Sequence, residues 1–152
     1  MERDIEELLP HRRPFVFVDK ILSINAESIT TLKTFKGEEE YFKGHFPGNP
    51  VVPGVLLIEV MAQTAGLLAS GIFSGGDMEK SAGTVFYLSR VIDVKFRRPI
   101  VPPKTVKTSA TVIGAFGDAV KVTVQIEAEG ETAAEGELVL SKIDINKERG
   151  VV

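Results

Sequence analysis

Residues 55–70 read VLLIEVMAQTAGLLAS, and this stretch decides the fold. When the segment is drawn as a helix, its apolar residues lie on every face instead of forming one stripe. Such a distribution predicts a helix that is buried on all sides. Pro53 suits the first turn, because its missing N–H leaves no hydrogen bond unmade there. We expect the helix to end at the glycines that follow, which are Gly71, Gly75 and Gly76.

Most of the remaining chain has the pattern of β-strands. Residues 120–128 alternate between apolar and polar side chains, which predicts a strand in a sheet with one dry and one wet face. Further strands are predicted over residues 15–24, 28–35, 84–91, 93–97, 106–113 and 138–143. The first ten residues suit a short helix, and residues 146–152 suit a frayed tail. Because nothing else can cover the buried helix, an antiparallel sheet must wrap it, and we predict one α+β domain over residues 1–152.

Composition and charge exclude several classes of protein. The 152 residues include no cysteine, so disulfides and thiolate metal sites are ruled out. The net charge of −3 gives no sign of a nucleic-acid-binding surface. No apolar run reaches the ~20 residues that span a bilayer. The acidic N-terminus lacks the pattern of an export signal, so we expect a cytoplasmic protein.

A loop of restricted conformation precedes the helix. Residues 42–54 read FKGHFPGNPVVPG and contain three prolines and three glycines. Such a loop either simply connects to the helix or positions functional groups. His45 lies in it, and aromatic neighbours such as Phe46 indicate an apolar cleft. His11 is the only other histidine in the sequence, so it is the competing candidate for proton transfer near neutral pH.

The helix also carries a carboxylate among apolar residues. Glu59 and Gln63 are four residues apart and share one face. Burial suits Glu59 to proton donation, although a structural carboxylate bound to an amide or an arginine is equally compatible. At the helix start, the N–H groups of Gly54 and Val55 have no intrahelical partner and can stabilise a developing negative charge. These groups suit proton abstraction beside a carbonyl, coupled to loss or addition of water.

Other chemistries find no support in the sequence. No HExxH-type spacing offers a metal site, and no GxSxG motif offers a serine nucleophile. In GGDMEKS, residues 75–81, a glutamate replaces the glycine that a phosphate loop needs before its lysine. The GAFG of residues 114–117 is too short for a dinucleotide fingerprint. We therefore predict no metal and no cofactor.

Residues 44–66, GHFPGNPVVPGVLLIEVMAQTAG, resemble the signature of FabZ-type 3-hydroxyacyl-acyl-carrier-protein dehydratases. LPHRRPFVFVDKI at residues 9–21 and FYLSRVIDVKFRRPIVPPKT at residues 86–105 are also similar to that family, so the resemblance covers nearly the whole chain. It implies a hot-dog fold, in which an antiparallel sheet curls around a central helix. It also implies a dimer whose two sheets join edge to edge, often assembled further as a trimer of dimers.

The resemblance implies a role for each matching residue. His45 and Glu59 are the expected catalytic pair, donated by different chains at the dimer interface. The Gly54 amide is expected to bind the thioester carbonyl, and Gln63 to support the glutamate. Glutamate at position 59 favours the FabZ type over the FabA type, which has aspartate there. Arg13 departs from the family's usual tyrosine, which leaves the edge of the site open.

Other matching positions concern the acyl chain and its carrier. His11 belongs to the same stretch as Arg13 and is expected to be structural. Phe86 and Tyr87 fall where the family lines its acyl tunnel. The implied substrate is a 3-hydroxyacyl chain on the phosphopantetheine arm of an acidic acyl carrier protein, dehydrated in fatty-acid synthesis. Three basic residues, Arg97, Arg98 and Lys104, form a group that can dock this carrier. The alternative is that they are a solvated end of a strand.

Two alternative functions remain open. The fold itself also suits an acyl thioesterase, which would hydrolyse the same thioester. A non-enzymatic carrier-binding subunit is the second alternative. The presence of both His45 and Glu59 argues against the second, because a scaffold has no need for a buried acid.

Overall fold

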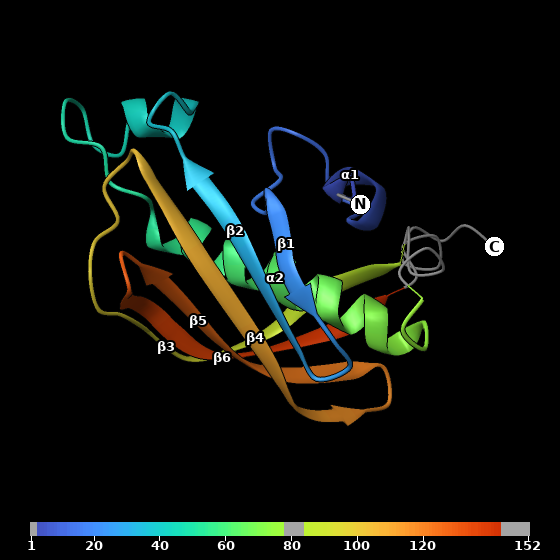
Figure 1. The fold of residues 1–152 in the computed structure, drawn as a ribbon. Helices are drawn as coiled ribbons and strands as arrows, with labels where there is room; N and C mark the ends of the chain where they lie inside the picture. Colours follow the sequence, from blue (N-terminus) through green and yellow to red (C-terminus); the bar gives the residue numbers. More distant parts are fainter. Residues whose placement is uncertain (1–2, 78–83, 144–152) are drawn as a thin grey trace.

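Six strands curve around one long helix in a computed structural model that describes residues 3–77 and 84–143 (Figure 1). The elements are α1 (Ile5–Leu8), β1 (Lys20–Ile24), β2 (Ser28–Phe35), the 3-10 helix η1 (Glu40–Lys43), α2 (Gly54–Phe73), β3 (Val85–Phe96), β4 (Lys104–Phe116), β5 (Ala119–Ala128) and β6 (Glu131–Ile143). All strand pairs are antiparallel, in the order β1-β2-β4-β5-β6-β3. The predicted α+β hot-dog fold is confirmed.

The helix α2 is the core of the fold. Its middle turns are buried, and Val60, Met61 and Leu67 have no exposed surface, whereas the last residue, Phe73, is exposed. By length and composition α2 could cross a membrane, but 67% of that stretch is buried inside the fold, as in a core helix. The first turn differs, because Val55 is 74% exposed. The prediction of burial on all sides is therefore wrong for the start of the helix.

The predicted strand over residues 15–24 is confirmed only for its second half, because β1 (Lys20–Ile24) pairs with β2 whereas residues 15–19 form no strand. The preceding backbone runs along α2 instead. There the side-chain amide of Gln63 accepts from the Phe17 N–H (2.7 Å) and donates to the Phe15 carbonyl (3.0 Å). A side chain therefore satisfies backbone groups that would otherwise pair with a neighbouring strand.

Other elements are longer than predicted. β6 begins at Glu131 instead of residue 138. The sequence does not predict this early start, because the stretch ETAAEG of residues 131–136 contains small and charged residues that are not typical of a strand. Close packing of β6 against β3 requires glycine at position 136, because a Cβ there would lie 2.6 Å from the Val94 side chain. β4 extends beyond residues 106–113 at both ends, and α2 reaches Phe73. The strands predicted over residues 84–91 and 93–97 form one strand, β3, whose pairing with β6 has two shifts of register.

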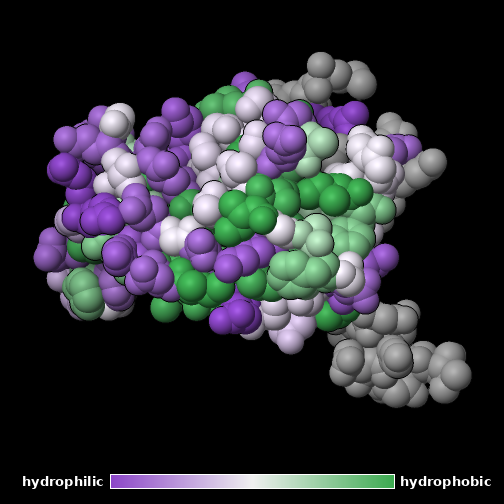
Figure 2. Space-filling view, turned by 90° about the horizontal axis from the view of Figure 1, so that it is seen from below, coloured by the Kyte–Doolittle hydropathy of each residue, from purple (hydrophilic) through white to green (hydrophobic). Residues whose placement is uncertain are grey.

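The two faces of the sheet differ as the alternation predicts. Val120, Val122, Val124 and Ile126 of β5 are buried in the core. Apolar side chains nevertheless remain exposed elsewhere. When the molecule is seen from below, apolar residues gather across the middle of its surface (Figure 2). β3 is an edge strand, and its outer side pairs with no strand among residues 3–77 and 84–143. A single chain therefore leaves both apolar surface and a strand edge uncovered.

Candidate active site

His45 is held by the main chain of its own loop. Its Nδ1 lies 2.8 Å from the carbonyl oxygen of Val51, and because a carbonyl can only accept, Nδ1 carries a proton. The His45 N–H donates to the Tyr41 carbonyl (3.1 Å), and the His45 carbonyl accepts from the Val51 N–H (3.0 Å). The ring stacks on Phe46, with 4.0 Å between centroids. In the neutral ring Nε2 is thus an unprotonated acceptor, as a general base requires.

The start of α2 combines unpaired amides with apolar side chains. Within the described residues, neither Gly54 nor Val55 donates its N–H to an acceptor, as expected in the first turn of a helix. A Cβ at position 54 would lie 3.3 Å from the Phe96 ring, so glycine allows the ring to approach closely. Val55 and Phe96 are both exposed. This end of α2 can therefore receive a carbonyl group that is attached to a hydrocarbon chain.

Phe96 is a site residue that the sequence alone does not predict. The available signal is its position directly before Arg97, inside a stretch that resembles the FabZ family. Its contact with Gly54 joins the end of β3 to the start of α2, two segments that are far apart in the chain.

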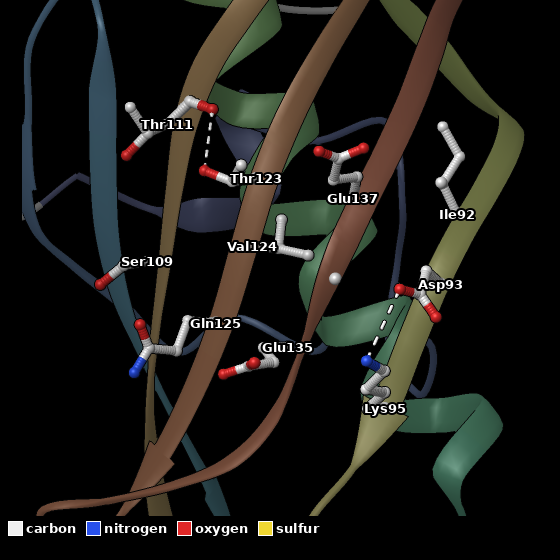
Figure 3. Close-up of a pocket in the computed structure, with 11 residues that line it drawn as sticks. Ile92, Asp93, Lys95, Ser109, Thr111, Thr123, Val124, Gln125, Glu135 and Glu137 are labelled. Carbon is white, nitrogen blue, oxygen red and sulfur yellow. Dashed lines mark hydrogen bonds and ion pairs between the residues drawn. The ribbon is translucent and has the colours of Figure 1, made fainter.

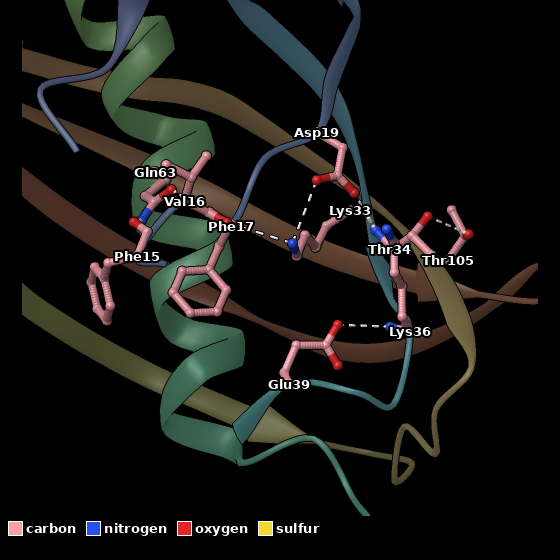
Figure 4. A network of polar contacts seen from close by, with 10 residues as sticks. All are labelled: Phe15, Val16, Phe17, Asp19, Lys33, Thr34, Lys36, Glu39, Gln63 and Thr105. Atoms are coloured by element: carbon pink, nitrogen blue, oxygen red, sulfur yellow. Dashed lines mark hydrogen bonds and ion pairs between the residues drawn. The ribbon is translucent and has the colours of Figure 1, made fainter. Parts of the chain in front are cut away.

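Glu59 is held by Gln63, one turn later on α2. The Gln63 Nε2 donates to Glu59 Oε1 (3.0 Å) and to the Phe15 carbonyl, while Gln63 Oε1 accepts from the Phe17 N–H. Figure 4 shows Gln63 beside the segment that contains Phe15 and Phe17, and this segment is also held by Lys33. Because both ends of the amide are bonded to the backbone, its orientation is determined and its N–H is directed at the glutamate.

His11 also contacts Glu59. Its Nε2 lies 3.5 Å from Glu59 Oε1, and both side chains are partly buried. The His11 ring stacks on Phe15, with 6.2 Å between centroids. The sequence predicts only a structural role for His11, because no local pattern places the segment after α1 against α2.

The structure does not bring the two expected catalytic side chains together within one chain. No hydrogen bond or ion pair joins His45 to Glu59. His45 belongs to the loop before α2, whereas Glu59 contacts the N-terminal segment through His11. A site that uses both groups must therefore be completed by another copy of the chain or bridged by substrate.

Phe86 and Tyr87 lie on opposite faces of β3. Phe86 lines a cavity of about 20 Å³ together with His11, Gln63 and residues further along α2. Tyr87 is 52% exposed and pairs across the sheet with Ser141 of β6. Successive residues of a strand point to opposite faces. Within this chain only Phe86 lies beside α2, and the expectation that both aromatic residues line the acyl tunnel stays a prediction.

The chain matches one family over nearly its whole length. A FabA-like domain matches residues 9–142. The 3-hydroxyacyl-[acyl-carrier-protein] dehydratase FabZ of Acetivibrio thermocellus is 35% identical over 145 residues, which are 95% of each chain. The FabZ of Polynucleobacter necessarius is 41% identical over 135 residues, 88% of this chain and 87% of the relative. The chain belongs to the FabZ family.

Solved structures share the fold of this FabZ family member at much lower sequence identity. The dehydratase heterocomplex ApeI:P from Xenorhabdus doucetiae has a TM-score of 0.80 at 17% identity, covering 96% of this chain and 95% of the other. A hypothetical thioesterase from Streptococcus pneumoniae, solved with coenzyme A, has a TM-score of 0.61 at 9% identity, covering 82% and 84%. These likenesses establish the fold, whereas the chemistry must be argued from the site.

The basic residues expected to dock a carrier are each paired with a glutamate of the same chain. The pairs are Arg97–Glu135 (2.8 Å), Arg98–Glu131 (2.9 Å) and Lys104–Glu129 (2.6 Å). The hydrogen bond from Arg97 lowers the pKa of Glu135, and the one from Lys104 lowers the pKa of Glu129. Such solvent-exposed pairs contribute little stability and can exchange partners.

A larger hollow lies on the outer face of the sheet and is mostly polar (Figure 3). It has a volume of about 470 Å³ between β3, β4, β5 and β6, and Asp93 pairs with Lys95 at its side (3.7 Å). None of the expected catalytic residues lines it. Across the part of the chain that the structure describes, no cluster of histidine, aspartate or glutamate could hold a metal ion.

Proposed function

We propose that this chain dehydrates 3-hydroxyacyl groups on acyl carrier protein to trans-2-enoyl groups, in the fatty-acid synthesis of the cytoplasm. The observation that carries the proposal is the state of His45, whose Nδ1 is bound to a carbonyl so that Nε2 is left as a proton acceptor. Membership of the FabZ family supports the same reaction, because the named relatives are dehydratases of this substrate class. Glu59, held by Gln63, supplies the acid that the reaction also needs.

The reaction removes a proton and a hydroxyl group from neighbouring carbons. His45 Nε2 accepts the proton from C2, and the electrons of that C–H bond move toward the thioester carbonyl. Glu59, in its acid form, donates a proton to the C3 hydroxyl. The C3–O bond then breaks, water leaves, and the C2–C3 double bond forms. Each proton transfer of this kind contributes roughly 10²- to 10⁴-fold to the rate.

Backbone and side-chain donors stabilise the charges that develop. The free N–H groups of Gly54 and Val55 stabilise negative charge on the thioester oxygen, which the positive end of α2 also favours. The Gln63 N–H stabilises the carboxylate that Glu59 becomes. Phe46 is expected to contact the substrate beside His45, and Phe86 to line the path of the acyl chain.

We propose that the site is completed in a homodimer, in which His45 acts with the partner's Glu59. The free edge of β3 can pair with the same edge of a second copy, which would continue the sheet and protect an edge that otherwise invites aggregation. Exposed Phe46, Val55 and Phe96 offer apolar surface near the start of α2. A trimer of dimers is the larger assembly that we expect.

The carrier is proposed to dock at Arg97, Arg98 and Lys104. The Arg97 and Arg98 ion pairs are exposed and the Lys104 side chain is partly exposed, so the acidic surface of a carrier can compete with the chain's own glutamates. Replacing Arg97 and Arg98 with glutamate should raise the apparent KM for carrier-bound substrate and spare a small thioester. Equal effects on both substrates would place the docking surface elsewhere.

The main experiment is incubation with a 3-hydroxyacyl thioester while enoyl absorbance and free thiol are both recorded. We expect enoyl absorbance without thiol release. Free thiol would instead favour a thioesterase, a function that the same fold also hosts. His45→Ala and Glu59→Gln should each lower kcat by roughly 10²-fold or more, with unchanged circular dichroism. Near wild-type rates in both variants would overturn the site assignment.

Mixed assemblies test whether the site is shared between chains. His45→Ala and Glu59→Gln subunits carrying different tags are co-expressed, and doubly tagged assemblies are purified. In a shared site, one of the two sites in a mixed dimer has both groups intact, so as much as about half of the wild-type turnover should return. Absence of any recovery would place both groups in a single-chain site.

A further inference from the structure

His11 is the one histidine that the proposed reaction leaves unused, yet it lies close to the proposed catalytic acid. Its Nε2 lies 3.5 Å from Glu59 Oε1, the same oxygen that accepts from Gln63. Glu59 Oε2 has no hydrogen-bond partner among the described residues and remains available for substrate. Two side chains from different segments thus converge on one oxygen of the carboxyl group.

The tautomer of His11 is decided at Nε2. Nδ1 is buried and has no hydrogen-bond partner among residues 3–77 and 84–143. It is unsatisfied in either neutral tautomer, so the contact of the other ring nitrogen makes the difference. A proton on Nε2 lies beside the Glu59 Oε1 that already accepts from Gln63, whereas a lone pair on Nε2 would meet the lone pairs of that oxygen unfavourably. The favoured neutral form of His11 therefore carries its proton on Nε2.

The backbone around His11 is fixed so that the ring keeps this position. The Arg12 guanidinium donates to the carbonyls of His11 (2.7 Å) and Leu9 (3.0 Å). The Arg13 N–H donates to the Glu6 carboxylate (3.1 Å), which ties the segment to α1. The ring itself stacks on Phe15, so its orientation does not depend on Glu59 alone.

We propose that His11 is a positioning residue for Glu59, which it orients through its Nε2–H so that Oε2 is presented to the substrate hydroxyl. The two histidines of the chain are then held in opposite neutral tautomers, with the proton on Nδ1 in His45 and on Nε2 in His11. This inference rests on the proposed function of Glu59 as the acid.

Long-range ¹H–¹⁵N spectra of protein labelled at histidine test the tautomers without any activity measurement. Because the chain has only two histidines, the His45→Ala variant shows the His11 ring alone. At a pH where both imidazoles are neutral, we expect His11 to show a protonated Nε2 and an unprotonated Nδ1. Protonation of His11 at Nδ1, or an equal mixture of tautomers, would overturn the proposal.

Kinetics separate positioning from packing. His11→Phe keeps a ring against Phe15 but has no N–H, and small misplacements of catalytic groups cost up to roughly 10²-fold. We expect kcat to fall about 10- to 100-fold with little change in KM. His11→Gln places an amide donor near the position of Nε2 and should recover most of that loss. A wild-type kcat in His11→Phe, or no recovery in His11→Gln with an intact fold, would contradict positioning.

A double-mutant comparison distinguishes failure of this inference from failure of the proposed function. If His11 acts through Glu59, His11→Phe should lower the residual rate of Glu59→Gln far less than it lowers the wild-type rate. Equal fold-losses in both backgrounds would show that His11 acts independently. Full activity of Glu59→Gln itself would instead overturn the role of Glu59, whatever the spectra show for His11.

Discussion

The two halves of the proposed site are held in different ways. His45 is fixed within residues 41–51, by backbone groups of Tyr41 and Val51. Glu59 is fixed by side chains, because Gln63 links it to the backbone of the N-terminal segment and His11 approaches it from the same segment. The loop half, which contains His45, thus depends on contacts between residues that are close in the chain. The helix half, which contains Glu59, depends on contacts between residues that are distant in the chain.

The difference teaches where the site tolerates change. A half that is held by main-chain hydrogen bonds should survive most substitutions of its supporting side chains. A half that is held through one buried amide should fail when that amide is lost, in stability as well as in rate. Three further substitutions can break or sharpen this contrast.

The largest effect is expected for Gln63→Leu. The change leaves the buried N–H of Phe17 and the carbonyl of Phe15 without partners, which should lower the free energy of unfolding by about 2 to 5 kcal/mol. The turnover should fall as well, since Glu59 loses its donor. Denaturant unfolding and initial rates measure the two losses.

A matched control is Gln125→Leu, on the outer face of the sheet. Among the described residues, the Gln125 amide bonds only to the side chains of Thr132 and Glu127, so this variant should change the free energy of unfolding by less than about 1 kcal/mol. If both leucine variants lost the same stability, the Gln63 amide would not be the support that the geometry indicates.

An intermediate effect is expected for Gly54→Ala, at the substrate side of the loop half. The new Cβ would lie 3.3 Å from the Phe96 ring, so the ring must shift by a few tenths of an ångström. We expect about a 10-fold loss of kcat/KM, with stability changed by less than about 1 kcal/mol. Phe96→Leu in the same chain should relieve the contact and restore part of the rate. Unchanged kcat/KM in Gly54→Ala would remove Phe96 from the site.

The smallest effect is expected for Tyr41→Phe. Tyr41 supports His45 through its carbonyl and not through its hydroxyl, so kcat should stay within about 2-fold of wild type. A large loss of kcat would show that the loop half also depends on a side chain. Burial, with help from the nearby Glu39 carboxylate, raises the pKa of Tyr41 to about 12.

The raised pKa of Tyr41 has a consequence for stability at high pH. An unfolded tyrosine ionises near pH ~10, so the stability contributed by the neutral phenol is present below that pH and is lost as the pH rises toward 12. Tyr41→Phe should lessen this alkaline loss of stability. Ultraviolet difference titration should also lose the phenolate step near pH 12, and a step that persists in the variant would contradict its assignment to Tyr41.

Local patterns predicted much of the architecture. The apolar residues of 55–70 and the alternation of 120–128 are sufficient for a buried helix and a two-faced sheet, because burial and backbone period act directly on residues that are neighbours in the chain. His45 and Glu59 stand out in the sequence for the same local reason. One lies in a loop restricted by proline and glycine, and the other is a charged residue in an apolar helix.

Only the tertiary structure decided what holds those two residues. The bonds from Gln63 to Phe15 and Phe17, and the approach of His11 to Glu59, join the N-terminal segment to α2. Their physical cause is the packing of one element against another, which a periodic pattern does not encode. The same limit explains the strand predicted over residues 15–24, because the apolar run of residues 15–18 suits a strand in a sheet and an extended segment packed along a helix equally well.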